Sequence, residues 1–271
     1  MASIHPGTHP DGPDEGLYDA RVGATVYSPI VGAFGALAVT AIAVVFTASD
    51  NAPSALVAFA TGLLAAGVFG SLVGSFGLAA IGAERHPTAN IAPAIMFVAV
   101  PVALSIIAIL GAFEVLAKIY VPESTRLFVL VTGAGGIYAV ILTATVIGDA
   151  TGLHPSTLTA SEFDVWRGRQ WLQNRAMSYT AANKVIAVTI VPPILGMMLR
   201  LFDIKFSITH TGVTWIVGTA IALSLLGAVM GADRTKHPLL GNDQVSMRKW
   251  EAWVTTAAIS LWTLGLLLFL P

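Results

Sequence analysis

The sequence predicts an all-α integral membrane protein with about seven transmembrane helices, arranged as one lone helix followed by three helical hairpins. Of its 271 residues, 55% are hydrophobic and only 11% are charged, and the mean hydropathy is +0.78. Soluble domains carry about 25% charged residues. The shortage of charge and the long uncharged stretches place the chain in the membrane class. A motif that recurs at the ends of three of these stretches predicts the hairpins.

Seven stretches are long enough to cross a bilayer, which takes about 20 apolar residues in a helix. They lie at about 28–48, 54–82, 91–117, 126–148, 184–202, 211–231 and 251–270. The second and third are longer than the hydrocarbon core requires, so we expect them to tilt or to protrude.

Prolines interrupt two of these stretches. Pro93 and Pro101 lie in the third, and Pro192 and Pro193 lie in the fifth. Proline has no backbone N–H and can kink a helix. Inside lipid, neighbouring protein must satisfy the backbone groups that such a break releases. We therefore expect bends inside a helix bundle.

A similar motif ends the second, fourth and sixth stretches: IGAERHP (81–87), IGDATGLHP (147–155) and MGADRTKHP (230–238). Glycine suits a helix C-cap, and a following proline prevents the helix from continuing. The motif indicates a hairpin repeat of about 65–85 residues. We interpret its members as cytoplasmic turns, with a direct role in ligand or ion chemistry as the alternative. The residues concerned are Arg85, His86, Pro87, His154, Pro155, His237 and Pro238.

Lysine and arginine are distributed unequally between the two sides of the predicted helices. Ten of the 14 lie in the N-terminal tail or in the loops after the second, fourth and sixth stretches. The positive-inside rule therefore predicts a multi-pass protein of the cell (plasma) membrane with its N terminus in the cytoplasm. Residues 1–27 read as a polar tail without the pattern of a signal peptide, and residues 28–271 as one transmembrane domain.

The cytoplasmic loop at 149–183 has two interpretations. A capping box from Thr159 to Glu162 precedes aromatic residues that alternate with arginines, such as Trp166 and Arg167. This pattern suits a short amphipathic helix at the membrane surface or against a partner subunit. An ordinary positively charged linker explains it equally well.

Composition also excludes several kinds of site. The absence of cysteine excludes disulfides, thiolate metal sites and cysteine nucleophiles. The net charge of −1 gives no electrostatic case for nucleic acid. All six histidines lie in the tail, in loops or at the edge of a span. We predict no catalytic residues and no metal cluster in this chain.

Small residues form stripes along several predicted helices, as in GVFGSLVGSFG of the second stretch. Such stripes let helix backbones approach closely where lipid gives no hydrophobic drive. We therefore predict tight helix packing at the residues that carry the stripes. These are Gly70, Gly74, Ser71 and Ser75 in the second stretch, and Gly133 and Gly136 in the fourth.

Ionisable residues inside membranes usually mark ion paths, but no predicted span has a charge near its middle. Glu114 lies near the outer end of the third stretch and Asp149 at the inner end of the fourth. Thr143 and Thr145 precede Asp149, and their hydroxyls could join its carboxylate around a hard cation. The alternative is that both carboxylates are interfacial charges that pair or snorkel.

Residues 70–117 resemble a proteolipid hairpin of rotary ATPases in their glycine ladder, their Arg-His-Pro loop and their alanine-rich return helix. In that family the second helix carries an ion-binding carboxylate. The equivalent position here falls at or near Ser105, which adds this residue to the ion-path candidates. Without that carboxylate the chain should not be a working rotor subunit.

The segments HPLLGNDQ (237–244) and TGAGG (132–136) are similar to parts of the integral membrane subunits of the sodium-translocating tetrahydromethanopterin S-methyltransferase. The strong glycine signature expected of that family is absent. The resemblance implies Na⁺ as the relevant ion, and nothing else in the sequence points to a cofactor.

These observations favour a membrane-embedded subunit of a multi-subunit, ion-translocating energy-coupling complex, which contributes helix packing and part of an ion path. Its partners would be other membrane subunits and the lipid bilayer. The alternative is a stand-alone transporter of a small solute or ion, in which the proline-broken third and fifth spans act as gates. A membrane-embedded enzyme ranks last, because no nucleophile–base set is present.

Overall fold

The computed structural model describes residues 20–48, 53–83, 91–150, 181–204, 206, 210–236 and 249–270. These residues form long helices and no strand. The helices are α1 (Ala20–Ala48), α2 (Ser54–Gly82), α3 (Ile91–Tyr120), η1 (Pro122–Ser124), α4 (Thr125–Ala150), α7 (Val191–Leu201), α8 (His210–Lys236) and α9 (Lys249–Phe269). Residues 181–189 are also helical and lead into α7.

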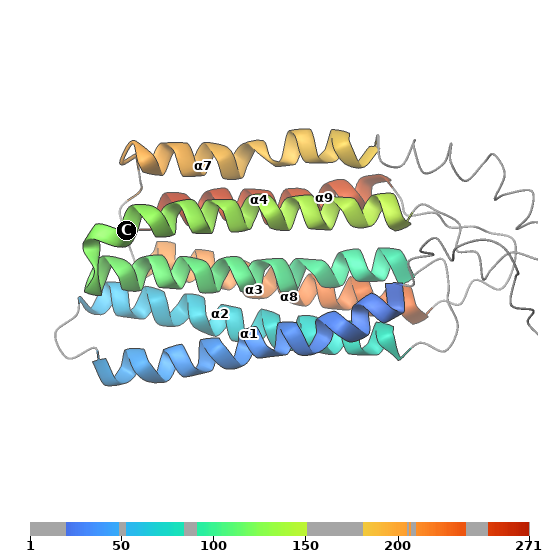
Figure 1. Cartoon of the computed structure of the whole chain (residues 1–271), viewed down its shortest axis with the longest axis horizontal. Coiled ribbons are helices and arrows are strands. Elements are labelled where there is room, and N and C mark those ends of the chain that lie inside the picture. The colour runs from blue at the N-terminus through green and yellow to red at the C-terminus, as the bar shows by residue number, and fades with distance from the viewer. Residues whose placement is uncertain are drawn as a thin grey trace, which may run out of the picture.

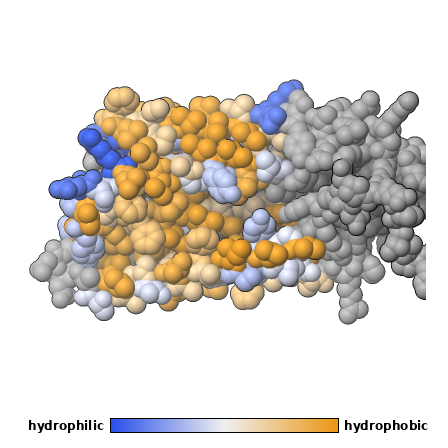
Figure 2. All heavy atoms as spheres, in the orientation of Figure 1, coloured by the Kyte–Doolittle hydropathy of each residue, from blue (hydrophilic) through white to orange (hydrophobic). Residues whose placement is uncertain are grey.

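The predicted fold class is confirmed. Seven helical segments of the described chain are long and apolar enough to cross a membrane, and Ala181–Leu201 counts as one of them. They run side by side along one axis (Figure 1). Apolar side chains cover most of the face of the bundle seen in Figure 2. A helix that is apolar on every side is typical of a membrane span.

The helix ends that flank the three predicted turns lie together at one end of the bundle (Figure 1). The turns themselves lie outside the described residues. They comprise Arg85, His86, Pro87, His154, Pro155, His237 and Pro238, and the 151–180 part of the predicted loop is likewise outside. The opposite end holds the C-terminal ends of α3, α7 and α9 (Figure 1). We call it the C-terminal end of the bundle.

Some helix bounds differ from those predicted. Helix α1 begins at Ala20, eight residues before the predicted span, and includes Pro29. Residues 1–19 of the predicted tail are outside the described chain. Helix α3 continues to Tyr120. The helices extend because helical hydrogen bonding does not stop at the point where hydropathy falls.

Helix α3 is the centre of the bundle. It packs against α1, α2, α4, α8 and α9. Of its most apolar window 72% is buried, compared with 22–50% for the other spans. The lone first helix of the prediction is not isolated in space, because α1 packs along α2. Helix α9 packs mainly against α4 and α7, which form the other side of the bundle.

The stripes of small residues on α2 lie on contacts with two different helices. A β-carbon added at Gly70 would lie 2.7 Å from the carbonyl oxygen of Pro101 on α3, and one added at Gly74 would lie 2.5 Å from Val102 Cγ2. Backbone therefore approaches backbone along the glycine stripe, because no side chain intervenes. The close approach places α2 directly against the proline turn of α3.

The serine stripe of α2 makes hydrogen bonds between helices. Ser71 and Ser105 of α3 share a hydrogen bond of 2.5 Å. Ser75 Oγ donates to the carbonyl of Ser28 on α1 at 2.9 Å, and Ser28 Oγ donates to the carbonyl of Ser75 at 3.0 Å. Short hydroxyl side chains thus join α1, α2 and α3 inside an apolar bundle.

Pro101 is accommodated by a glycine on each side. It removes the donor that would otherwise bond the carbonyl of Phe97, four residues earlier. Gly227 of α8 lies against this carbonyl, since an added β-carbon would be 2.7 Å from the Phe97 oxygen. Gly70 of α2 approaches the carbonyl oxygen of Pro101 itself, so backbone from both α2 and α8 lies against the proline turn of α3, as expected for a break inside lipid.

We predict that Gly70→Ala destabilises the protein, because its methyl group would meet the carbonyl of Pro101. Overpacking of this kind costs about 1–3 kcal/mol. Thermal unfolding of the purified protein in detergent measures the effect. Gly218→Ala is the matched control, since an added β-carbon there meets no atom within 4 Å. Equal melting temperatures for the two variants would contradict the packing argument.

Candidate functional site

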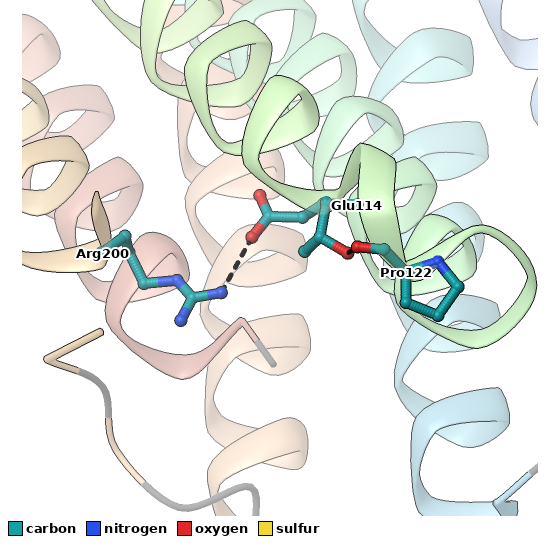
Figure 3. A network of polar contacts seen from close by, with 4 residues as sticks. Glu114, Pro122 and Arg200 are labelled. Carbon is teal, nitrogen blue, oxygen red and sulfur yellow. Dashed lines mark hydrogen bonds and ion pairs between the residues drawn. The ribbon is translucent and has the colours of Figure 1, made fainter. Parts of the chain in front are cut away.

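A buried ion pair joins α3 to α7 near the C-terminal end of the bundle. Arg200 Nη2 donates to Glu114 Oε1 at 3.1 Å. The two side chains are 3% and 0% exposed, respectively. They point toward each other between the two helices (Figure 3). A carboxylate and a guanidinium are therefore held together at a depth where water has little access.

The position of the pair follows from where the two helices end. Glu114 lies six residues before the end of α3, and Arg200 lies one residue before the end of α7. Both helices end at the same end of the bundle (Figure 1). The turn between α3 and α4 lies beside the pair (Figure 3), and it is closed by a hydrogen bond of 2.8 Å from Thr125 Oγ1 to the carbonyl of Pro122.

The TGAGG segment of α4 positions the helices around this pair. An added β-carbon at Gly133 would lie 3.0 Å from Met197 Sδ of α7, and one at Gly135 would lie 2.6 Å from Leu110 Cδ1 of α3. At Gly136 it would collide with Thr263 of α9. Three small residues thus let three helices approach α4 within little more than one turn.

Thr132 begins the same segment and faces the ion pair. Its hydroxyl lies beside the Glu114 carboxyl group without meeting hydrogen-bond geometry. Thr132 Oγ1 and Glu114 Oε2 are both buried, and neither has a hydrogen-bond partner among the described residues. The site therefore offers one ion-paired carboxylate oxygen and, next to it, two further oxygens.

Burying both charges is costly unless they are paired. Removing an ion from water costs several kcal/mol even after relaxation, and an opposite charge in good geometry offsets the cost. Ionisable residues in spans are rare and usually functional. The Glu114–Arg200 pair is therefore the candidate site among the residues that the structure describes.

A second polar contact holds the same span further along its length. Pro193 removes the helical donor for the carbonyl of Thr189. Ser260 Oγ of α9 donates to this carbonyl at 2.5 Å and replaces the lost bond. The span Ala181–Leu201 is thus fastened on one side of its proline break by Ser260 and on the other side by Glu114.

The five predicted ion-path residues are not brought together. Ser105 bonds Ser71, and it lies nine residues from Glu114 on α3, about 13 Å along the helix. Thr143 donates to the carbonyl of Ala139 in its own helix, and Thr145 likewise to that of Leu142. Asp149 lies in the last turn of α4, at the opposite end from Glu114, and its side chain is outside the described part.

Arg200 was not among the site residues predicted from the sequence. A usable signal was present, because Glu114 and Arg200 both lie near span ends on the same predicted side of the membrane. Glu251, in the first turn of α9, is also fully buried and was not singled out. A carboxylate suits the positive end of a helix dipole.

Within the described ranges no group of three or more histidine, aspartate or glutamate side chains could hold a metal ion. Comparison with protein-family models, with curated proteins and with solved structures gives no match. The function of the chain therefore has to be argued from its own residues.

We predict that Ser260→Ala lowers the free energy of unfolding by about 1 kcal/mol, the scale of hydrogen bonds between helices in membranes. The substitution leaves the Thr189 carbonyl without its donor. Thr256→Val on the same helix is the control, because its hydroxyl bonds only carbonyls within α9. Chemical unfolding of both variants in mixed micelles measures the difference, and equal losses would contradict a special role for Ser260.

We predict that Arg200→Met destabilises the protein by roughly 3–5 kcal/mol, because it leaves Glu114 buried without its partner. Replacing both residues, as Glu114→Met with Arg200→Met, recovers most of this loss, because both charges of the pair are then removed. Lys118→Met is the control for removing an exposed positive charge on α3. A double variant no more stable than Arg200→Met would contradict the coupling.

Proposed function

We propose that this multi-pass membrane protein is a membrane-embedded subunit of a larger, ion-translocating energy-coupling complex. In this proposal it contributes helix packing to the complex and carries part of an ion path at Glu114. We place it in the cell membrane with the ends that flank the three turns facing the cytoplasm, a side chosen by the excess of lysine and arginine.

The observation that carries the proposal is an outward-facing stripe of small residues on α8. Thr214, Gly218 and Ala222 are exposed and follow one another every four residues. Gly218 differs from the other glycines whose surroundings are described, because an added β-carbon would meet nothing within 4 Å. At the others the space is occupied by a neighbouring helix.

Small residues on a lipid-facing surface make few contacts with lipid chains, but they allow another helix to approach closely. The stripe on α8 has the character of the stripes that pack α2 against α3 and α4 against α9 inside the bundle. It therefore supports an additional helix from a partner subunit at this face. Two exposed apolar side chains would add to that contact: Trp215, next to Thr214, and Leu225, which lies seven residues after Gly218 and so on the same face of α8.

The ion-path part of the proposal rests on Glu114. Among the five sequence-predicted candidates it combines a carboxylate, complete burial and a charged partner on another helix. Membrane carboxylates with these properties mark ion and proton relays. The resemblance to the membrane subunits of the sodium-translocating methyltransferase belongs to this proposal as a related kind of complex.

A stand-alone transporter is the second candidate, favoured by the proline break in Ala181–Leu201. Broken helices line the binding sites of many transporters. Here, however, the carbonyl released by Pro193 is bonded by Ser260. A carbonyl bonded in this way is not available to a substrate unless the contact opens.

We predict that the protein, extracted in mild detergent from its native membrane, migrates on native gels with several different chains. Gly218→Leu fills the outward stripe and should abolish this co-migration while leaving the melting temperature of the purified chain unchanged, since Gly218 is exposed and an added β-carbon there meets nothing within 4 Å. Thr47→Leu, an exposed position on α1, is the matched control. Migration of the wild-type chain alone or with copies of itself would overturn the subunit proposal and favour the transporter.

A further inference from the structure

Tyr138 carries a hydroxyl group on the outer face of α4, within the apolar span Pro122–Thr145. Its side chain is 62% exposed. Helix α4 runs in front of α9 in Figure 1. In the part of the chain that the structure describes, no hydrogen bond to this hydroxyl is present. A polar group therefore faces outward from an otherwise apolar surface.

The depth of this hydroxyl keeps it away from water. At about 1.5 Å per residue, Tyr138 lies about 10 Å from Thr145, the nearer end of the span, and about 24 Å from Pro122. Side chains lean toward the N terminus of their helix, which for α4 is the farther end. The ring is therefore directed into the hydrocarbon, where no water is available and an unbonded hydroxyl is strongly unfavourable.

The hydroxyl cannot be satisfied by its own helix. The shorter side chains of Thr40 on α1 and Thr145 on α4 fold back and donate to carbonyls three or four residues earlier in the same helix. The Tyr138 hydroxyl stands at the far end of a rigid ring, so it points away from the backbone of α4. Lipid headgroups lie outside the hydrocarbon core and do not reach this depth. The acceptor therefore has to come from another molecule within the membrane.

We propose that the outer face of α4 around Tyr138 binds a transmembrane helix of a different subunit, and that Tyr138 donates to a backbone carbonyl of that helix. A carbonyl bonded within its helix has a second lone pair for such a donor. The bundle contains a contact of this kind between its own helices, because Trp262 Nε1 of α9 donates to the Ile216 carbonyl of α8 at 3.0 Å. The inference rests on the subunit part of the proposed function and adds a second contact face with a stated chemistry.

The surface around the hydroxyl has the form of a helix contact. Leu130, Ala134, Tyr138 and Leu142 are exposed and follow one another every four residues, over about 18 Å of α4. Such a row is one ridge of a helix surface and packs into a groove of another helix. Ala134 provides a shallow place one turn from the ring, so a second backbone can approach closely there.

Symmetry argues that this helix belongs to another chain. Copies of this protein share one orientation in the membrane, so a two-fold pair through α4 would be parallel. In a parallel pair residues of equal depth meet, which places Tyr138 against Tyr138 and Ala134 against Ala134. The two rings would then hold the helices apart at the level where a carbonyl has to come close. A different helix can place small residues opposite the ring.

The test uses single cysteines in the otherwise cysteine-free chain, labelled with a benzophenone maleimide. Val131→Cys places the label at an exposed position beside the row, where it does not fill the contact. Illumination in the native membrane and mass spectrometry of the products identify what lies within reach. We expect a cross-link to an apolar, membrane-spanning segment of a different chain. Val39→Cys, an exposed position on α1, is the matched control and should label lipid.

Removal of the hydroxyl tests the hydrogen bond itself. Tyr138→Phe, added to Val131→Cys, should leave the melting temperature of the purified chain unchanged, because the deleted oxygen bonds no described residue. It should lower the cross-link yield in a mild-detergent extract about three- to tenfold, the effect of losing one hydrogen bond between membrane helices. Tyr27→Phe removes a similarly exposed hydroxyl from α1 and should leave the yield unchanged.

Several results would overturn the inference. They are a cross-link from Val131→Cys to lipid only, to a copy of this chain or to a small lipid-soluble molecule, and a yield that Tyr138→Phe does not lower. Trp215→Cys probes the small-residue face of α8 in parallel. A partner cross-linked from Trp215→Cys but not from Val131→Cys would overturn this inference and leave the subunit proposal standing. The absence of a partner at both positions would overturn both.

Discussion

Inside a bilayer no water is available to bond a backbone or side-chain group that lacks a partner, and much of this structure follows from that constraint. Each proline break described within a span needs a neighbour. The Phe97 carbonyl released by Pro101 is covered by Gly227, and the Thr189 carbonyl released by Pro193 is bonded by Ser260. At these two prolines the released carbonyl therefore lies against another helix and not against lipid.

Small residues allow the helices to pack closely enough to hold the bundle together in lipid. Hydrophobic side chains gain nothing by leaving lipid for another helix, so close contact and short hydrogen bonds must hold the bundle together. On α2 the glycines face α3, while Ser71 bonds α3 and Ser75 bonds α1. The same chemistry reappears on α8, where Gly218 faces outward with no described residue against it.

The Glu114–Arg200 pair stands apart from these neutral contacts. Serine and glycine contacts stabilise the bundle whatever the pH, because they carry no charge. An ion pair between α3 and α7 depends on the charge of both partners, and only the carboxylate can lose its charge. The span that it fastens is also the one with adjacent prolines. A buried ion pair and two adjacent prolines thus occur in the same span.

The sequence by itself determined the membrane class, the seven apolar helices and the positions of the prolines within them, because hydropathy and length are properties of each segment alone. It did not determine which helices meet. Which residues meet depends on how each helix is rotated about its axis. This rotation brings Gly136 against Thr263, and Glu114 against Arg200, which lies 86 positions later in the chain. Apolar helices fix that rotation only through contact with one another, since lipid is equally compatible with every apolar face. Only the tertiary structure therefore decided which of the predicted polar residues make ordinary hydrogen bonds and which one carries a buried charge.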